Sequence, residues 1–315
     1  MSDFQITCVD WLLKSEHPSI RYLVKRDLLG ETPSQSDRDG LLAPGSPISK
    51  MLAELKENQY WIAPRSIYSP KYVATHWSLL LLCEYAAPPD LPQIRQAVRF
   101  ALEHAHTRFA KFRQNDPADH QMACFFGNVL RYSIYFGFED DPIVQEILAF
   151  LVQPKQGREW CCAYNLNMPC NWGAIRTLWG LAGLPASHQT EAVQLAVSSA
   201  VDITINSAAM LGNIDDAPQI PQHSLWEKTS FPLYYQSDRL FCLRALRDAG
   251  ALHHKQLLPT LRWLAERMSK DGTWRGNNPY KSRSWGFGME KEDTDHWVTL
   301  QSLLILSDAA QVHAL

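Results

Sequence analysis

Nearly every segment with a clear hydrophobic period repeats its apolar positions with helical spacing. Short apolar runs that are rich in β-branched residues and bounded by hairpin turns are nearly absent, so we expect an all-α chain. The first expected helical pair covers 10–13 and 20–29, with Pro18 at a helix start and Gly30 at a helix end. A polar connector rich in Pro, Ser, Asp and Gly follows, over about 30–49.

A repeat of roughly fifty residues follows the connector, and each unit pairs an amphipathic helix with a more apolar one. The expected pairs are 48–60 with 75–87, 94–105 with 124–137, 143–152 with 171–183, 189–205 with 236–250, and 257–269 with 295–306. A helix that is apolar on several faces is a buried helix, so the second member of each pair is expected inside. We therefore predict one domain over residues 1–315, an α/α toroid of about six hairpins around a central cavity.

Composition and charge narrow the functions of the 315-residue chain. It is 46% hydrophobic and 20% charged with a net charge of −3, which provides no basic surface for nucleic acid. The longest apolar runs are too short to cross a bilayer. The N-terminus has no basic segment followed by a long apolar core, so no secretion signal is expected. We expect a cytoplasmic protein with mostly reduced cysteines.

Two turns that end in tryptophan, QGREW at 156–160 and KDGTW at 270–274, resemble the Gln/Asp-Gly-Trp turns of terpenoid cyclases and protein prenyltransferase β-subunits. More specifically, the chain resembles uncharacterised bacterial proteins of that α/α-toroid superfamily. The matching segments run nearly from end to end: PSIRYLVKRDLL from Pro18, CFFGNVLR from Cys124, PCNWGAIRTLWGLAGLP from Pro169, FPLYYQSDRLFCLRAL from Phe231 and HWVTLQSLLIL from His296. The resemblance implies the toroid fold.

The chain departs from this superfamily in its acidic motifs. It has neither the DxDD acid motif of cyclases that protonate an alkene or epoxide nor a DDxxD diphosphate-binding motif. Squalene cyclisation and isoprenoid diphosphate transfer are therefore not carried over. Asp140 and Asp141 precede Pro142, which is typical of a helix cap. A lanthionine-synthetase-like site is not expected either, because Asn171 follows Cys170 where those toroids have a Cys-His-Gly element.

Three cysteines suggest a metal site. In a toroid of this kind, the N-terminal ends of the inner helices meet around one mouth of the cavity. Cys124, Cys162 and Cys170 are expected there as zinc ligands, because thiolate and imidazole suit tetrahedral zinc. His296, His76 or Asp238 would complete the set. The prenyltransferase relatives carry zinc in a comparable place with a different Asp/Cys/His ligand set. Structural thiols and a reactive thiol or redox pair are the alternatives.

The other candidate residues come from the same helix ends. Asp238, His296 and His76 are candidate catalytic residues. Each has a structural alternative: a buried core histidine for His76, and a position at a helix N-terminus for Asp238 and His296. Candidate substrate-binding residues are Arg21, Tyr22, Asn128, Trp172, Tyr235, Arg239 and Trp297.

These features predict an enzyme that acts on a small, largely apolar or aromatic molecule in an aromatic-lined cavity. With zinc it would be a transferase, a lyase or a hydrolase. The first alternative is a non-catalytic toroid that binds a hydrophobic ligand or a partner protein. The second is a carbohydrate-active α/α barrel. Glycoside hydrolysis normally needs two carboxylates facing one cavity, and the inner helix ends offer only Asp238.

Overall fold

The computed structural model describes residues 3–115, 122–207, 210 and 223–313, and confirms the prediction of an all-α chain. The helices are α1 (Asp3–Leu13), α2 (Pro18–Leu23), α3 (Gln35–Leu41), α4 (Pro47–Ala53), α5 (Thr75–Glu84), α6 (Pro92–Asn115), α7 (Ala123–Tyr135), α8 (Pro142–Val152), α9 (Asn171–Leu181), α10 (Glu191–Ile205), α11 (Arg239–Asp248), α12 (Leu258–Glu266) and α13 (Lys291–His313). The strands of the described part are β1 (Cys161–Cys162) and β2 (Met168–Pro169), which pair antiparallel. None of the described helices combines the length and the apolar character that crossing a membrane requires.

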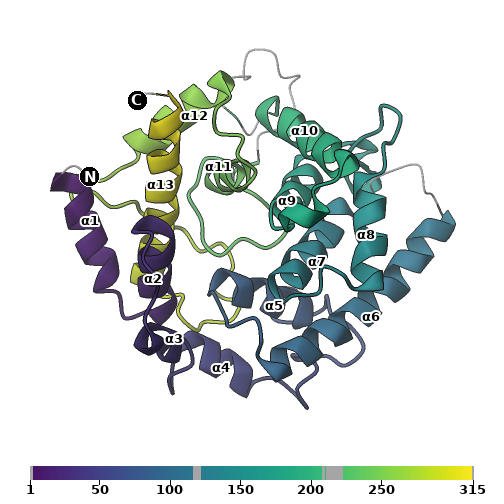
Figure 1. Ribbon diagram of the computed structural model, residues 1–315, viewed down its shortest axis with the longest axis horizontal. Helices are drawn as coiled ribbons and strands as arrows, with labels where there is room; N and C mark the ends of the chain where they lie inside the picture. The colour runs from purple at the N-terminus through teal and green to yellow at the C-terminus, as the bar shows by residue number, and fades with distance from the viewer. Residues whose placement is uncertain (1–2, 116–121, 208–209, 211–222, 314–315) are drawn as a thin grey trace.

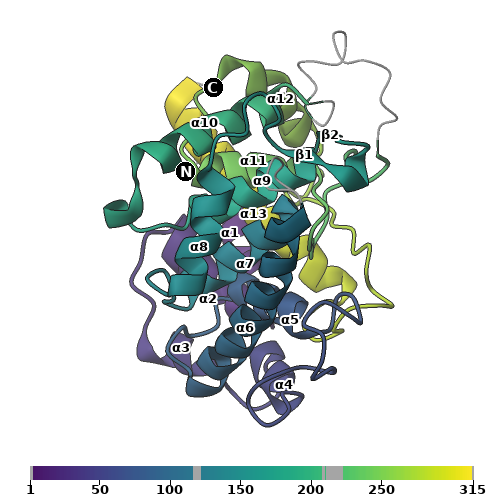
Figure 2. The same cartoon turned by 90° about the vertical axis from the view of Figure 1, so that its right-hand side faces the viewer.

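Alternate helices lie toward the middle of the molecule. Figure 1 shows α2, α5, α7, α9, α11 and α13 around the centre, with α1, α4, α6, α8, α10 and α12 outside them. Contacts join α5 to α7, α7 to α9, α9 to α11, α11 to α13, and α13 to α2. The β1–β2 hairpin projects at the edge of the molecule in Figure 2, and Tyr164 and Leu166 between its strands are exposed.

The pattern of buried residues explains which helices lie inside and which lie outside. All ten residues of α5 are buried, including His76 and Glu84. In α8 the buried residues are Val144, Ile147, Leu148 and Leu151, which share one face at helical spacing. A helix without a polar face is stable only where other helices surround it, whereas a one-sided helix covers them from outside.

Some helix boundaries differ from the predicted ones. The helix expected over 48–60 is shorter in the structure, where α4 begins at Pro47 and ends at Ala53. The polar connector contains a helix of its own, α3, which the sequence reading did not predict. Ser34 and Asp37 cap that helix reciprocally through side chain and backbone, so a short polar segment forms a regular turn.

Two tryptophans at the ends of turns make the same pair of hydrogen bonds. The indole of Trp61 donates to the carbonyl of Met51 in α4 (2.7 Å), and its backbone N–H donates to the hydroxyl of Thr75 in α5 (3.1 Å). Trp274 donates through its indole to Leu264 of α12 (2.8 Å) and through its backbone N–H to Thr299 of α13 (2.9 Å). Each tryptophan thus ties an outer helix to the inner helix that follows it.

Two glycines allow α7 and α9 to pack backbone against backbone. A Cβ on Gly127 would stand 2.6 Å from the backbone nitrogen of Thr177, and one on Gly180 would stand 2.7 Å from the carbonyl oxygen of Gly127. Both distances are shorter than any relaxed contact, and the opposing atoms belong to helix backbones that cannot turn aside. The glycines therefore set the spacing of the two helices.

Gly127→Ala is expected to destabilise the protein by about 1–3 kcal/mol or more, because the added methyl group forces α7 away from α9. Gly40→Ala is the matched control: this helical glycine has nothing within 4 Å of an added Cβ. The control should be neutral or stabilising, since alanine favours a helix by roughly 0.5–1 kcal/mol. Urea unfolding would measure both. Equal stabilities of the two variants would show that the α7–α9 contact is looser than described.

Candidate functional site

The predicted zinc ligands lie close together at the start of α7 and α9. Cys162 belongs to β1, and the backbone N–H of Cys170 donates to the carbonyl of Trp160 (2.9 Å), which closes the hairpin. A Cβ on Gly173 would lie 3.7 Å from the Cβ of Cys170 and 3.9 Å from the backbone nitrogen of Cys124, so these two cysteines are neighbours. Burial, together with the nearby thiols of Cys170 and Cys162, raises the pKa of Cys124 to about 12.

The geometry does not present these thiols as a ligand set. Within the described residues, no group of three or more His, Cys, Asp or Glu side chains is arranged to hold a metal ion. All seven cysteines are free thiols. The zinc site expected at Cys124, Cys162 and Cys170 therefore stays a prediction.

His76 is buried in an aromatic cage. Its ring stacks on Phe125 (centroids 4.6 Å apart) and meets the edges of Trp77 (4.5 Å) and Tyr132 (5.6 Å). Burial, together with the positive charges of Arg108 and Arg176, lowers the pKa of His76 to about 3. His76 is therefore a neutral ring at physiological pH, and its surroundings match the structural alternative of a core histidine.

Asp238 caps α11. Its carboxylate accepts a hydrogen bond from the backbone N–H of Phe241 (2.8 Å), which is the structural role that the sequence offered as an alternative. Burial raises the pKa of Asp238 to about 7, against the opposing effect of the backbone bonds from Phe241 and Ser230. A carboxyl group that titrates near neutral pH can exchange a proton under physiological conditions.

Other predicted site residues gather near these groups. Trp172 meets Tyr235 edge to face (5.8 Å), and Tyr235 also lies 6.1 Å from Trp77. The side-chain amide of Asn128 donates to the carbonyl of Tyr234 (2.9 Å). The structure therefore brings the beginnings of α5, α7 and α9 and the segment before α11 into one aromatic assembly.

The remaining predicted residues lie elsewhere in the ring. His296 stacks on Trp11 of the outer helix α1 (3.9 Å, 21°), and Trp297 stacks on Phe231 (4.4 Å). The guanidinium of Arg239 lies 5.1 Å from the ring of Trp263 in α12. Two further residues of this group are in helix α2: Arg21 donates to the carbonyl of Ser15, and Tyr22 lies under Arg26 (5.5 Å).

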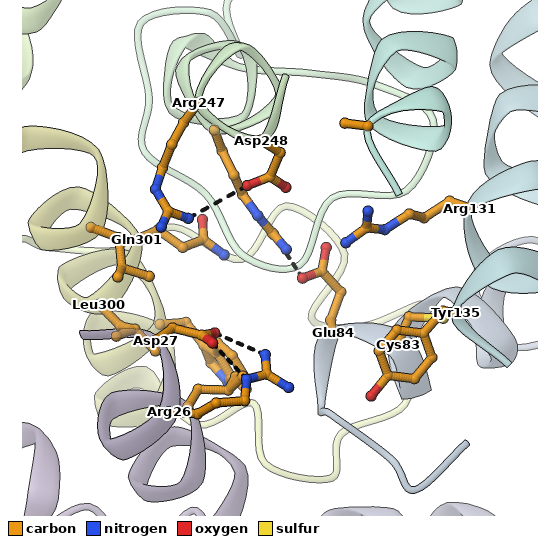
Figure 3. A pocket seen from close by; sticks show the side chains of 15 residues that line it. Arg26, Asp27, Cys83, Glu84, Arg131, Tyr135, Arg247, Asp248, Leu300 and Gln301 are labelled. Carbon is orange, nitrogen blue, oxygen red and sulfur yellow. Dashed lines mark hydrogen bonds and ion pairs between the residues drawn. The ribbon is translucent and has the colours of Figure 1, made fainter. Parts of the chain in front are cut away.

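A second, chemically different place lies at the opposite ends of the inner helices. A pocket of about 430 Å³ is lined at the ends of α5, α7, α9 and α11, by the π-helical turn Val24–Leu28 and by α13 (Figure 3). Its lining residues are Leu23, Arg26, Asp27, Cys83, Glu84, Arg131, Tyr135, Ala182, Arg244, Arg247, Asp248, Trp297, Leu300, Gln301 and Leu304. Trp297 is the one predicted site residue among them.

Most charges in this pocket form ion pairs. Arg244 donates to Glu84 (2.7 Å), and their side chains are only 18% and 5% exposed. Arg26 donates to Asp27 (2.5 Å), its neighbour in the π-helical turn. Arg247 bonds Asp308 (2.5 Å) and lies 3.4 Å from Asp248.

Arg131 differs from the other three pocket arginines. Its Nη1 donates to the backbone carbonyl of Trp179 (3.2 Å), and its guanidinium lies 4.5 Å from that indole ring. In the described part of the chain no carboxylate forms an ion pair with it. Figure 3 shows its guanidinium directed into the pocket, toward the side of Glu84.

Comparison with known proteins adds no identification. No protein-family model matches the chain, no curated protein matches it, and no solved structure matches it.

The buried titratable groups predict how stability depends on pH. Burial lowers the pKa of His17 and of His76 to about 3 from an ordinary 6.5, and raises that of Asp238 to about 7 from 3.8. Between about pH 4 and 6 the unfolded chain gains two protons on the histidines, whereas the folded chain holds one on Asp238. The unfolded state thus binds one more proton, and stability should rise with pH by about 1.4 kcal/mol per unit from these groups.

His76→Phe should lower that slope by about 1.4 kcal/mol per pH unit, because it removes one proton that only the unfolded chain binds. Urea unfolding between pH 4.5 and 6 measures it, and His253→Gln, at an exposed position, is the control. A slope identical in wild type and His76→Phe would mean that His76 is protonated inside the fold.

Proposed function

We propose that the chain is an α/α toroid that binds a small, polar, charged molecule in the pocket at the C-terminal ends of its inner helices. Support for the toroid comes from the alternation of inner and outer helices and from the contacts that link successive inner helices, ending at α13 and α2. A cytoplasmic location, where thiols stay reduced, is part of this proposal.

The observation that carries the binding function is the convergence of charged side chains from distant segments inside an apolar core. Glu84, Arg131, Arg244 and Asp27 come from four different elements and line one pocket. Removing a charge from water is costly, and breaking even a buried pair is strongly unfavourable. Charged groups gathered in a cleft are therefore functional candidates. The volume of about 430 Å³ suits a small ligand.

The carbohydrate-active alternative is supported by the number of carboxylates in the pocket but not by their surroundings. Three carboxylates, those of Asp27, Glu84 and Asp248, face one pocket, as that alternative requires. Glycoside hydrolysis also needs one carboxyl group kept protonated by apolar surroundings, and each of these three contacts an arginine. The pocket therefore supports binding of a polar molecule more directly than glycoside cleavage.

A second candidate function is the predicted enzyme that acts on a small, largely apolar substrate with a cysteine-ligated zinc. Its support is the closeness of Cys124, Cys162 and Cys170, beside the aromatic side chains of Trp172 and Tyr235. The non-catalytic alternative, in which the thiols only pack, rests on the raised pKa values of Cys124 and Cys170, caused by burial, and on the core setting of His76.

Blocking the pocket should abolish ligand binding. Polar, charged metabolites that bind should raise the melting temperature, because a ligand at 100 times its Kd stabilises the folded state by about 2.7 kcal/mol. Ala182→Phe places a large ring in the pocket and should remove this shift, whereas Ala182→Ser should keep it. Circular dichroism would confirm that both variants are folded. A shift that survives in folded Ala182→Phe would place the ligand site elsewhere.

Elemental analysis of protein purified under reducing conditions tests the second candidate. A cysteine-ligated zinc predicts about one zinc per chain, lost in Cys124→Ser, Cys162→Ser and Cys170→Ser, since thiolates bind it directly. Cys8→Ser is the control, because this buried thiol on α1 donates to the carbonyl of Gly272 (3.0 Å), away from the hairpin. Wild-type protein without metal, or metal retained in all three variants, would mean that these cysteines only pack.

A further inference from the structure

Three arginines surround the indole of Trp179 on α9. The guanidinium carbons lie 4.5 Å from its ring centre in Arg131, 5.2 Å in Arg244 and 5.7 Å in Arg176. Arg176 also lies 3.7 Å from the ring of Phe241. Attraction to the faces of aromatic rings stabilises each cation, but it does not neutralise the charge.

One carboxylate serves these three cations. Glu84 pairs with Arg244 at 2.7 Å, and no ion pair joins a carboxylate to Arg131 or Arg176 among the described residues. Arg176 is fully buried, and its Nη2 donates to the carbonyl of Gln236. The C-terminal carbonyls of the helices offset part of this charge, as the bond from Arg131 to Trp179 illustrates. Around Trp179, three guanidinium groups thus share one ion-paired carboxylate, and Arg131 is the member of this group that lines the pocket without such a partner in the described part of the chain.

The buried polar atoms around Trp179 that lack a partner are donors. They are Nε of Arg131, Nε and Nη1 of Arg176, and the indole N–H of Trp179. Unpaired buried donors are unfavourable by about 1–3 kcal/mol each, and more when charged. Of these residues Arg131 lines the pocket, and its donor and positive charge, both unpaired among the described residues, favour a ligand group that is negatively charged and rich in acceptors.

We propose that the ligand of this pocket carries an oxyanion, a carboxylate or a phosphate group, which binds the guanidinium of Arg131 beside the Glu84–Arg244 pair. This inference rests on the proposed binding function of the pocket. The planar fork of arginine holds two oxygens of such a group at once. The rest of the ligand faces the carboxylates of Asp27 and Asp248 and the side chain of Gln301, which accept hydrogen bonds from hydroxyl or ammonium groups. The ligand class is thus a small acid or phosphate ester that also bears such donors.

The probes are inorganic phosphate, glycerol phosphate and glycerate, each compared with chloride at the same ionic strength. At least one should raise the melting temperature of the wild type and bind in calorimetry, and the better probe identifies the phosphate or the carboxylate class. Arg131→Gln should weaken that binding about tenfold or more, as expected for loss of a charged hydrogen bond. Arg262→Gln, on the exposed face of α12, is the matched control and should bind as the wild type does.

Arg131→Lys separates charge from geometry and serves as the second variant if Arg131→Gln does not fold. It keeps the positive charge but loses the fork, so its affinity should lie between those of the wild type and Arg131→Gln. Anion binding with unchanged affinity in folded Arg131→Gln or Arg131→Lys would overturn the assignment of Arg131.

The failures of the two proposals look different. If the pocket binds only cationic compounds, and Ala182→Phe blocks them, the oxyanion inference is wrong and the binding function stands. If compounds of every charge bind without any effect of Ala182→Phe, or none binds at all, the binding function fails, and the oxyanion inference fails with it.

Discussion

The inner helices have no face toward solvent, and this constraint shapes the chemistry of the molecule. Every residue of α5 is buried, so its two most polar side chains, His76 near the start and Glu84 at the end, must both find surroundings inside the ring. His76 is surrounded by aromatic rings and is neutral, whereas Glu84 pairs with Arg244. A buried polar side chain is tolerated only where it has a partner or stays uncharged, and the inner helices bring several such side chains together.

The same helices therefore present two different environments at their two ends. On α7, Cys124 belongs to the beginning and Arg131 to the end, seven residues or roughly 10 Å along the helix axis. The beginning faces aromatic rings and thiols, and the end faces guanidinium and carboxylate groups. Because side chains this far apart on one helix do not contact each other, the two environments can serve separate roles.

The helical period allowed most of the fold to be predicted, because burial on one or several faces is written directly into the spacing of apolar residues. The reading of helix beginnings also brought together His76, Cys124, Trp172 and Tyr235. It missed the charged pocket, because Arg247 in the last turn of α11 is equally typical of a capped helix end, and Arg131 and Arg244 carry no local signal of a site. The Glu84–Arg244 pair joins residues 160 positions apart, a distance that no local pattern encodes. One sequence signal of the pocket was Glu84, the single carboxylate at the end of the apolar run of α5.

The paired hydrogen bonds of Trp61 and Trp274 bear on how this architecture tolerates change. The backbone bond of Trp61 reaches Thr75, the first residue of α5, whereas that of Trp274 reaches Thr299, the ninth residue of α13. The connecting segments, 62–74 and 275–290, also differ in length. Because each tryptophan bonds directly to both helices, the length of the connecting segment does not by itself set the position of either helix. Insertions and deletions between the anchor and the inner helix can therefore accumulate during evolution while the helical frame stays in place.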